Sequence, residues 1–323
     1  MVGSEKRLTE EDDILAKTSA TVTVLGSLIV DFRVRLPRPP QNGETLAVLE
    51  SGVFAGGKGL NQAIGVKRLG GRAHLIGRLG DDLFGKFLLD ALRKEKMAID
   101  GITTDPEIPT GTAIPVSEGE GSERQYILHV PGANQTLVAA DVSQALAAKS
   151  KEGYLMLQGE VNREANLVAA LFAKEHGIAV ILDPAPTHAM SDDLVLLADY
   201  LTPNQVELAQ LTHSEVARDR DQAIGQADML FSRESHLTAV VATLGPWGAY
   251  VASRQGHFHI AAPPVTAEDP TAAGDVFNAA FAVTLAQGGS IRDAAERGVE
   301  AGTYACQIKG ALPSIPRTTD LGW

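Results

Sequence analysis

A single cysteine, Cys306, occurs among the 323 residues of this sequence. An intrachain disulfide is therefore excluded, and the scarcity of thiols suits a reducing cytosol, so we expect a cytoplasmic protein. Because Cys306 lies in the apolar, helix-like run Ala301–Ile308, we interpret it as a small core residue.

Long apolar runs are also missing, and no stretch of about 18 apolar residues predicts a transmembrane helix. Residues 1–19 are rich in charge and lack the apolar segment of a secretory signal, so we expect a flexible N-terminal extension there. Basic residues are in the minority, with 28 Lys and Arg against 40 Asp and Glu. The resulting net charge of −12 argues against nucleic acids and anionic membranes as partners.

The 8 histidines show no metal-ligand spacing, and no Ser–His–Asp or Cys–His arrangement stands out. His257 and His259 alternate along a short run, which favours an isolated surface strand. The chemistry of this chain must therefore be sought among other residue types.

Short apolar runs alternate with helix-like segments through most of the chain. This alternation predicts an α/β fold with a doubly wound, mostly parallel sheet and helices on both faces. Ligands then bind beyond the C-terminal ends of the strands. The predicted strands are Thr21–Leu25, Ala73–Gly77, Lys151–Leu157, Ile178–Leu182 and Ala239–Thr243, and the predicted helices are Leu60–Leu69, Leu83–Lys96, Arg163–His176 and Gln222–Ser235.

Two regions interrupt this alternation. Arg33–Phe54 is proline-rich at first and ends in the strand-like run Thr45–Phe54. Thr110–Val130 contains two strand-like runs, Thr112–Val116 and Arg124–Val130, joined by a polar turn, and this pattern predicts a β-hairpin.

The segment Glu268–Asn278 joins a polar loop to an apolar helix through a turn of small residues. Ala272, Ala273 and Gly274 let backbone N–H groups approach a ligand, and the first turn of a helix carries partial positive charge. That combination suits an anion such as a transferring phosphoryl group. Asp275 at this turn could accept a proton from an attacking hydroxyl. A plain helix N-cap is the alternative interpretation.

A second glycine-rich turn, Phe54–Ala63, also leads into a helix. Gly52–Lys58 reads G-x-x-x-x-G-K, but Gly59 stands where a P-loop needs a Ser or Thr hydroxyl, so we reject a P-loop. The glycine-rich backbone still lets a ligand come close, and Lys58 and Asn61 add a cation and an amide. This combination suits a polyhydroxylated ligand. A simple tight turn is the alternative.

Together these two turns resemble the ribokinase/phosphofructokinase-B family of sugar kinases. Gly56-Gly57-Lys58-Gly59-x-Asn61-Gln62-Ala63 is similar to the family's N-terminal signature, and the run from Asp269 to Asp275 is similar to its C-terminal one. Weaker matches lie between them in the family's order: Gly26-Ser27-x-x-x-Asp31, Gly132-Ala133-Asn134, Gln158-x-Glu160, Asp183-Pro184-Ala185-Pro186, Thr202-Pro203-Asn204-x-x-Glu207 and Thr243-Leu244-Gly245-x-x-Gly248.

The resemblance implies one ribokinase-like kinase domain over residues 20–323. It also implies that a small β-sheet lid, inserted from about residues 32–56 and 110–131, covers the sugar. In this family the lid can serve as a dimer surface, so we expect a homodimer formed through it.

The resemblance also implies roles for single residues. Asp275 is the expected general base, and the N–H groups of Ala273, Gly274 and Asp275 are the expected anion hole. Without the resemblance, Asp31 would be read as a turn residue and Glu160 as the N-cap of the next helix. The residues expected to bind the sugar are Asp31, Gly57, Lys58, Asn61, Glu160 and Asp275.

ATP and metal ions are the further ligands that the resemblance implies. Magnesium is expected at Glu207, although Asn204 and Glu207 also fit a helix-capping pattern. We interpret Trp247 as a surface residue, with a position facing the nucleotide as the alternative. The expected nucleotide-binding residues are Asn204, Thr243, Gly245, Gly248, Gly274 and Val299. Potassium activation is expected through Asp269, which supplies the only charged ligand, with Thr271, Ala305, Ile308, Gly310 and Ser314.

These assignments predict ATP-dependent phosphorylation of the primary hydroxyl of a pentose, with D-ribose as the expected substrate. Three positions depart from the family pattern: Ile29 and Asp183 stand where ribokinases often carry Asn, and Val299 where they often carry Asn or His. Ile29 resembles deoxyribokinases, so 2-deoxyribose, another sugar or a nucleoside stays open. A non-catalytic sugar- or nucleotide-binding module is a further alternative, against which the retention of Asp275 and Lys58 argues.

Overall fold

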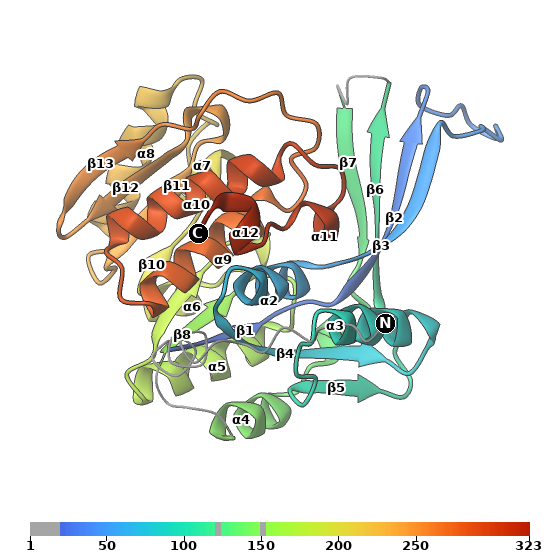
Figure 1. The fold of residues 1–323 in the computed structure, drawn as a ribbon, viewed down its shortest axis with the longest axis horizontal. Coiled ribbons are helices and arrows are strands. Elements are labelled where there is room, and N and C mark those ends of the chain that lie inside the picture. The colour runs from blue at the N-terminus through green and yellow to red at the C-terminus, as the bar shows by residue number, and fades with distance from the viewer. Residues whose placement is uncertain (1–19, 120–123, 149–152) are drawn as a thin grey trace, which may run out of the picture.

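The computed structural model describes residues 20–119, 124–148 and 153–323, so the predicted N-terminal extension lies outside the described residues. A 9-stranded sheet forms the centre of the main body, in the order β13-β12-β11-β10-β9-β8-β1-β4-β5 (Figure 1). Its neighbours from β11 to β5 run parallel, whereas β12 and β13 run antiparallel. The strands are β1 (Thr21–Leu25), β4 (Arg72–Gly80), β5 (Ile102–Asp105), β8 (Gly153–Leu157), β9 (Ala179–Leu182), β10 (Tyr200–Leu201), β11 (Ala239–Thr243), β12 (Ala249–Ser253) and β13 (Gly256–Ile260).

Both faces of this sheet are buried, because successive side chains of each strand point to opposite sides. In β11, Ala239 and Val241 belong to one hydrophobic core, whereas Val240 and Ala242 belong to the other. The predicted doubly wound α/β fold is confirmed. The first core is covered by α2 (Lys58–Arg68), α3 (Leu83–Lys94), α9 (Ala273–Ala286) and α10 (Ile291–Ala305), and the second by α4 (Ala139–Ala147), α5 (Arg163–Glu175), α6 (Asp192–Leu197), α7 (Gln205–Leu211) and α8 (Arg220–Arg233).

Helix α9 is buried on nearly every side, since each residue from Asp275 to Ala286 is buried. It packs closely on α2: a Cβ built on Gly65 would lie 2.6 Å from the Cβ of Ala279. This close packing fixes the N-terminal ends of α2 and α9 next to each other. The glycine-rich turn before α2 and the small-residue turn before α9 therefore face one region. Two short helices, α11 (Ala311–Ser314) and α12 (Thr318–Leu321), end the chain.

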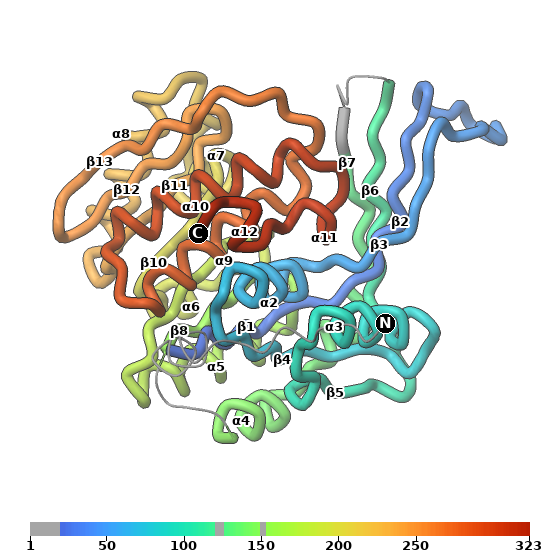
Figure 2. The backbone as a smooth tube through the Cα atoms, viewed as in Figure 1, coloured from blue at the N-terminus to red at the C-terminus, as the bar shows by residue number. Residues whose placement is uncertain are grey.

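A second, 4-stranded sheet, in the order β3-β2-β6-β7, stands apart from the main sheet (Figure 1). Its strands are β2 (Ile29–Leu36), β3 (Glu50–Gly56), β6 (Gly111–Glu118) and β7 (Arg124–Val130), and β2 pairs with β6 in parallel. The blue and green segments of this sheet run side by side in Figure 2, although α2, β4, α3 and β5 separate them in sequence. This sheet, hereafter the lid sheet, occupies the two places where the sequence predicts a lid.

Some boundaries differ from the predictions. β2 begins at Ile29, ahead of the predicted lid start at residue 32, so Asp31 lies inside a strand and its alternative as a turn residue is wrong. The strand predicted over Lys151–Leu157 is seen from Gly153, and residues 151–152 lie outside the described residues. β13, with its two histidines, is not isolated: it pairs with β12 as the edge of the main sheet. In the part of the chain that the structure describes, no helix is long and apolar enough to cross a membrane.

Candidate active site

Two cavities meet at the start of α9. The first, about 570 Å³, lies between the lid sheet and the N-terminal end of α2. The second, about 330 Å³, lies between α9, α10 and the loop after β11. Pro270 lines both, and the turn that follows it separates them: Ala272 and Asp275 face the first cavity, whereas Ala273 and Gly274 face the second.

The turn before α9 presents backbone N–H groups to both cavities. Ala272 adopts φ 65°, a left-handed conformation that residues with a Cβ rarely take. The Ala273 N–H donates to Pro270 O at 3.1 Å, so it closes the turn. The next N–H groups, of Gly274 and Asp275, belong to the first helical turn and have no intrahelical partner. A Cβ built on Gly274 would meet no atom within 4 Å, so this backbone faces open space suited to an anion.

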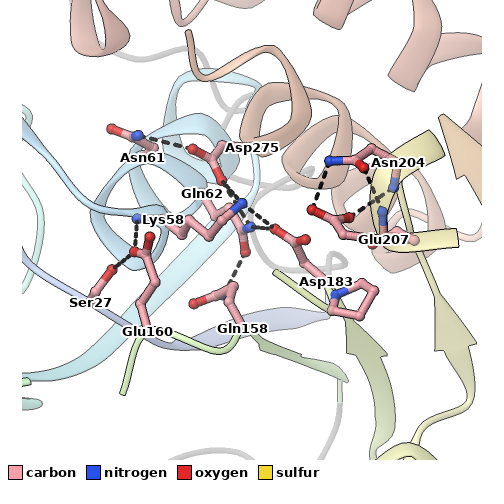
Figure 3. A network of polar contacts seen from close by, with 12 residues as sticks. Ser27, Lys58, Asn61, Gln62, Gln158, Glu160, Asp183, Asn204, Glu207 and Asp275 are labelled. Carbon is pink, nitrogen blue, oxygen red and sulfur yellow. Dashed lines mark hydrogen bonds and ion pairs between the residues drawn. The ribbon is translucent and has the colours of Figure 1, made fainter. Parts of the chain in front are cut away.

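Asp275 is 6% exposed and is held by three side chains of α2 (Figure 3). Asn61 Nδ2 donates to its Oδ2 at 2.9 Å, and Gln62 Nε2 donates to its Oδ1 at 3.1 Å. Lys58 Nζ lies 4.0 Å from Oδ1. Burial raises the pKa of Asp275, while Lys58 and the two amides oppose that rise. The carboxylate is thereby a stronger base than an exposed aspartate, which suits proton abstraction.

Asp183 forms the second half of this polar network. It follows β9, and its Oδ2 lies 3.2 Å from Lys58 Nζ and accepts from Gln62 Nε2 at 2.9 Å. Burial raises the pKa of Asp183 to about 7, with Glu207 and Asp275 adding to the rise and Lys58 opposing it. Burial also opposes the charge of Lys58, but the surrounding carboxylates, Asp183 first, raise its pKa overall.

Glu160 joins the loop after β8 to the start of α2. Its Oε2 accepts from Lys58 N at 3.1 Å and from Ser27 Oγ (Figure 3). Gly57, the N-cap of α2, has φ 92°, which a residue with a Cβ rarely adopts. The alternative that Glu160 caps the next helix is wrong, because Asn162 is the N-cap of α5.

The lid sheet contributes the opposite wall of the first cavity. Asp31 on β2 faces it, and burial, with repulsion from Glu160 and Asp275, raises the pKa of Asp31 to about 7. Ile29, 2% exposed, lines the same cavity. All the residues predicted to bind sugar line this one cavity: Asp31, Gly57, Lys58, Asn61, Glu160 and Asp275.

The second cavity collects every residue predicted to bind the nucleotide, namely Asn204, Thr243, Gly245, Gly248, Gly274 and Val299. Gly248 has φ 91°, and a Cβ there would lie 2.0 Å from Ile260 O, so the turn after β11 requires glycine. Val299 is buried and offers an apolar contact. Trp247 is not among the residues that line this cavity; it is half-buried and packs on the second core, so it is not a plain surface residue.

The interpretation of Cys306 as a core residue is wrong. Helix α10 ends at Ala305, one residue earlier, and Cys306 is its C-cap. The thiol is only half-buried and lines the second cavity. The apolar run continues past the end of the helix, so the sequence pattern overestimated the burial of Cys306.

Asn204 and Glu207 form a capping box at the start of α7. Asn204 Oδ1 accepts from Glu207 N at 3.0 Å, and Asn204 N donates to Glu207 Oε2 at 2.8 Å. The capping alternative is therefore realised, and Glu207 also lines the first cavity. Among the described residues, no group of three or more His, Cys, Asp or Glu could hold a metal ion. Magnesium needs less: one or two carboxylates, water and substrate phosphates suffice, so Glu207 fits it.

Asp269 does not fit a charged potassium ligand. Its Oδ1 accepts from Thr271 N at 3.1 Å and Thr271 Oγ1 at 2.6 Å, and its Oδ2 accepts from Gly310 N at 2.8 Å and from Arg33 Nη1. An ionised carboxylate has about four acceptor sites, so these donors occupy all of them. Two other members of the predicted set make contacts that leave their oxygens able to accept further: Ala305 O accepts from Ile308 N, and Ser314 Oγ donates to Ala311 O.

Several residues of the site were not assigned a role from the sequence. Gln62 bridges Asp183 and Asp275, and Gln158 Nε2 donates to Gln62 Oε1 at 2.6 Å. Asn134 fixes the start of β2 by bonds to both Leu28 N and Leu28 O, at 2.9 and 3.0 Å. Gln62, Gln158 and Asn134 all lie in the motifs that resemble the kinase family, so their place in those motifs could have indicated a role. Arg33 stands in no motif, and its contact with Asp269 had no sequence signal.

The comparisons with known proteins agree with this geometry. Residues 19–318 match the family described as pfkB family carbohydrate kinase. A ribokinase from Haemophilus influenzae is 36% identical over 297 residues, which are 92% of this chain and 95% of that protein. A deoxyribokinase from Salmonella typhi is 30% identical over 297 residues, 91% of this chain and 95% of that protein.

A solved structure, the ribokinase from Arabidopsis thaliana complexed with ribose and ATP, has a TM-score of 0.82 at 28% identity, covering 94% of this chain and 97% of that chain. The fold, the family match and the relatives point the same way, and the family predicted from the two glycine-rich turns is confirmed. This chain belongs to the pfkB family of carbohydrate kinases.

Proposed function

We propose that this protein transfers the γ-phosphoryl group of ATP to the primary hydroxyl of D-ribose. The observation that carries the proposal is the position of Asp275. Its buried carboxylate faces the first cavity at the N-terminus of α9, directly beside the turn that opens onto the second. A sugar in the first cavity and a nucleotide in the second would meet at this turn.

In the proposed reaction, the primary hydroxyl oxygen of the sugar bonds to the γ-phosphorus while the bond to the bridging oxygen breaks and ADP leaves. Asp275 accepts the hydroxyl proton. The N–H groups of Gly274 and Asp275 stabilise the charge on the phosphoryl oxygens. Lys58, Asn61 and Gln62 hold the carboxylate of Asp275 in place.

Sugar hydroxyls are proposed to bind Asp31 and Glu160, which both line the first cavity. Adenine and the phosphates are proposed to contact Val299 and the glycine turn after β11. Magnesium, when bound, neutralises charge on the phosphate oxygens, and Glu207 would hold it through its water shell. We propose no step through potassium, because the carboxylate of Asp269 is already saturated.

A 2-deoxyribose kinase is the second candidate. Ile29 is apolar, buried and lines the sugar cavity, and a deoxyribokinase is among the relatives. A coupled assay of ADP release with ATP and magnesium over a panel of ribose, 2-deoxyribose, other sugars and nucleosides tests both candidates. Turnover with ribose at the highest kcat/KM supports the first. Absence of turnover with every acceptor would favour a non-catalytic binding module.

The lid sheet is the proposed dimer surface. Leu128 and Val130 on β7 lie two residues apart, so they share one face of the lid sheet, and both expose large apolar side chains. Burial of such a surface by a second copy is favourable. Light scattering of the wild type and of Leu128→Lys tests it, with a dimer expected for the first and a monomer for the second. The cytoplasmic location stays a prediction.

A further inference from the structure

Arg33 links the lid sheet to the turn that begins α9. It lies on β2 two residues after Asp31, on the same face of the strand, and it lines the same cavity. Its guanidinium Nη1 donates to Oδ2 of Asp269, which lies just ahead of the turn. The Arg33 side chain is 25% exposed, whereas that of Asp269 is 1% exposed. The contact therefore joins a cavity-lining cation to a buried anion.

Asp269 holds three parts of the chain together through its two oxygens. One oxygen binds Thr271 within the turn, and the other binds Gly310 N before α11 and Arg33 from the lid sheet. A buried carboxylate is stabilised both by neutral donors and by a positive charge beside it. Among the described residues, Arg33 is the only cationic side chain that forms an ion pair with Asp269. The charge that a bound cation would supply is thus already present in the chain.

We propose that the guanidinium of Arg33 takes the place of a monovalent cation at Asp269, so that this protein positions its anion-hole turn without potassium. Arg33 is a positioning residue in this proposal, since it acts through Asp269 and the turn. The part of this inference that concerns turnover rests on the proposed kinase function.

Arg35 is the matched control. It lies on β2 two residues after Arg33, so it is the same residue type on the same strand face. Its Nε lies 3.4 Å from Glu50 Oε2 on β3, so its ion pair stays within the lid sheet. A change at Arg35 removes a similar charge without touching Asp269.

The experiment compares the wild type, Arg33→Met and Arg35→Met in buffers where potassium replaces tetramethylammonium at constant ionic strength. The wild type is expected to keep the same kcat with and without potassium. Without potassium, Arg33→Met should lose about tenfold to a hundredfold in kcat, the loss that a small displacement of reacting groups produces, and potassium should restore most of it. Arg35→Met should behave as the wild type.

A second readout needs no turnover. Potassium should raise the melting temperature of Arg33→Met and leave those of the wild type and Arg35→Met unchanged. The proposal is overturned if the wild type requires potassium, if Arg33→Met is fully active without it, or if potassium neither restores nor stabilises Arg33→Met. The potassium titration of the wild type decides the question even if Arg33→Met does not fold. A wild type inactive on every sugar in both buffers refutes the kinase proposal instead, while the melting comparison still tests Arg33.

Discussion

Lys58 Nζ lies 3.2 Å from Asp183 Oδ2, so the lysine beside the sugar cavity is paired with a carboxylate where the resemblance leads one to expect an amide. The carboxylate is the better shielded partner, with the Asp183 side chain 6% exposed and the Lys58 side chain 26% exposed. Removing one partner of such a pair leaves an uncompensated charge. The acid at position 183 thus makes Lys58 important for stability as well as for the site.

Lys58→Met should destabilise the protein, and more strongly at pH 8 than at pH 6. The pKa of Asp183 is already raised to about 7 with Lys58 present, so without Lys58 it rises further and the side chain protonates at the lower pH. A raised pKa contributes stability that is lost as the pH increases through it. We expect a loss of about 2 to 4 kcal/mol at pH 8, measured by urea unfolding. Lys58→Arg, which keeps the charge, should lose less; an equal loss at both pH values would contradict the expectation.

Asp275→Asn should abolish phosphoryl transfer while the protein stays folded and binds ATP. The amide keeps the shape but cannot take the proton, and loss of a general base typically costs about 10²–10⁴-fold in rate. Single-turnover kinetics and ATP titration by calorimetry measure the two properties. Near-wild-type turnover would remove Asp275 from the mechanism.

Asp31→Asn should stabilise the protein while weakening sugar binding. The pKa of Asp31 is raised to about 7, so its charge opposes folding at pH 8 and is largely neutralised at pH 5. The expected gain is about 2 kcal/mol at pH 8, roughly half the value of the full shift, because solvent screens a partly exposed group. The gain should be smaller at pH 5, and KM for ribose should rise. A loss of stability at pH 8 would show that Asp31 has a structural role instead.

Ile29→Asn should raise the preference for ribose over 2-deoxyribose. Ile29 offers no hydrogen bond, and a buried hydroxyl left without a partner costs on the order of 1–3 kcal/mol. The wild type should therefore accept 2-deoxyribose unusually well. The ratio of kcat/KM for the two sugars, in both proteins, measures the shift. If the wild type rejects 2-deoxyribose by orders of magnitude, another group binds the C2 hydroxyl.

Cys306 should react slowly with N-ethylmaleimide, and ATP should protect it. Burial raises the pKa of this thiol, with Asp269 adding to the rise, so little reactive thiolate is present near neutral pH. The thiol lines the second cavity, where the nucleotide is proposed to bind. Mass spectrometry after timed labelling, with Cys306→Ser as the blank, follows the reaction. Protection by ribose alone but not by ATP would place the nucleotide elsewhere.

The fold was predictable because its signals are local. Runs such as Ala239–Thr243 are apolar on both faces, and only a covered parallel strand accommodates them. The site was predictable in part because its residues cluster in two turns, at Gly57 and Ala272. Those turns need small residues for geometric reasons, which leaves a pattern in the sequence.

The remaining contacts were not predictable because they join distant residues. Arg33 and Asp269 are 236 positions apart, and Lys58 and Asp183 are 125 positions apart. No periodicity or spacing encodes such pairs; they exist only once the lid sheet and α2 have been placed. Cys306 was misplaced for a different reason, since an apolar run does not mark where α10 stops.

The parallel pairing of β2 with β6 has a consequence for how the chain is made. During synthesis the β2–β3 hairpin leaves the ribosome before β6 does, and one edge of β2 stays open until β6 follows. An open strand edge is a template for pairing with another chain. Nascent chains at high concentration are therefore prone to associate before β6, which begins at Gly111, has emerged. A chain truncated before Gly111 should aggregate more than a chain truncated after β7.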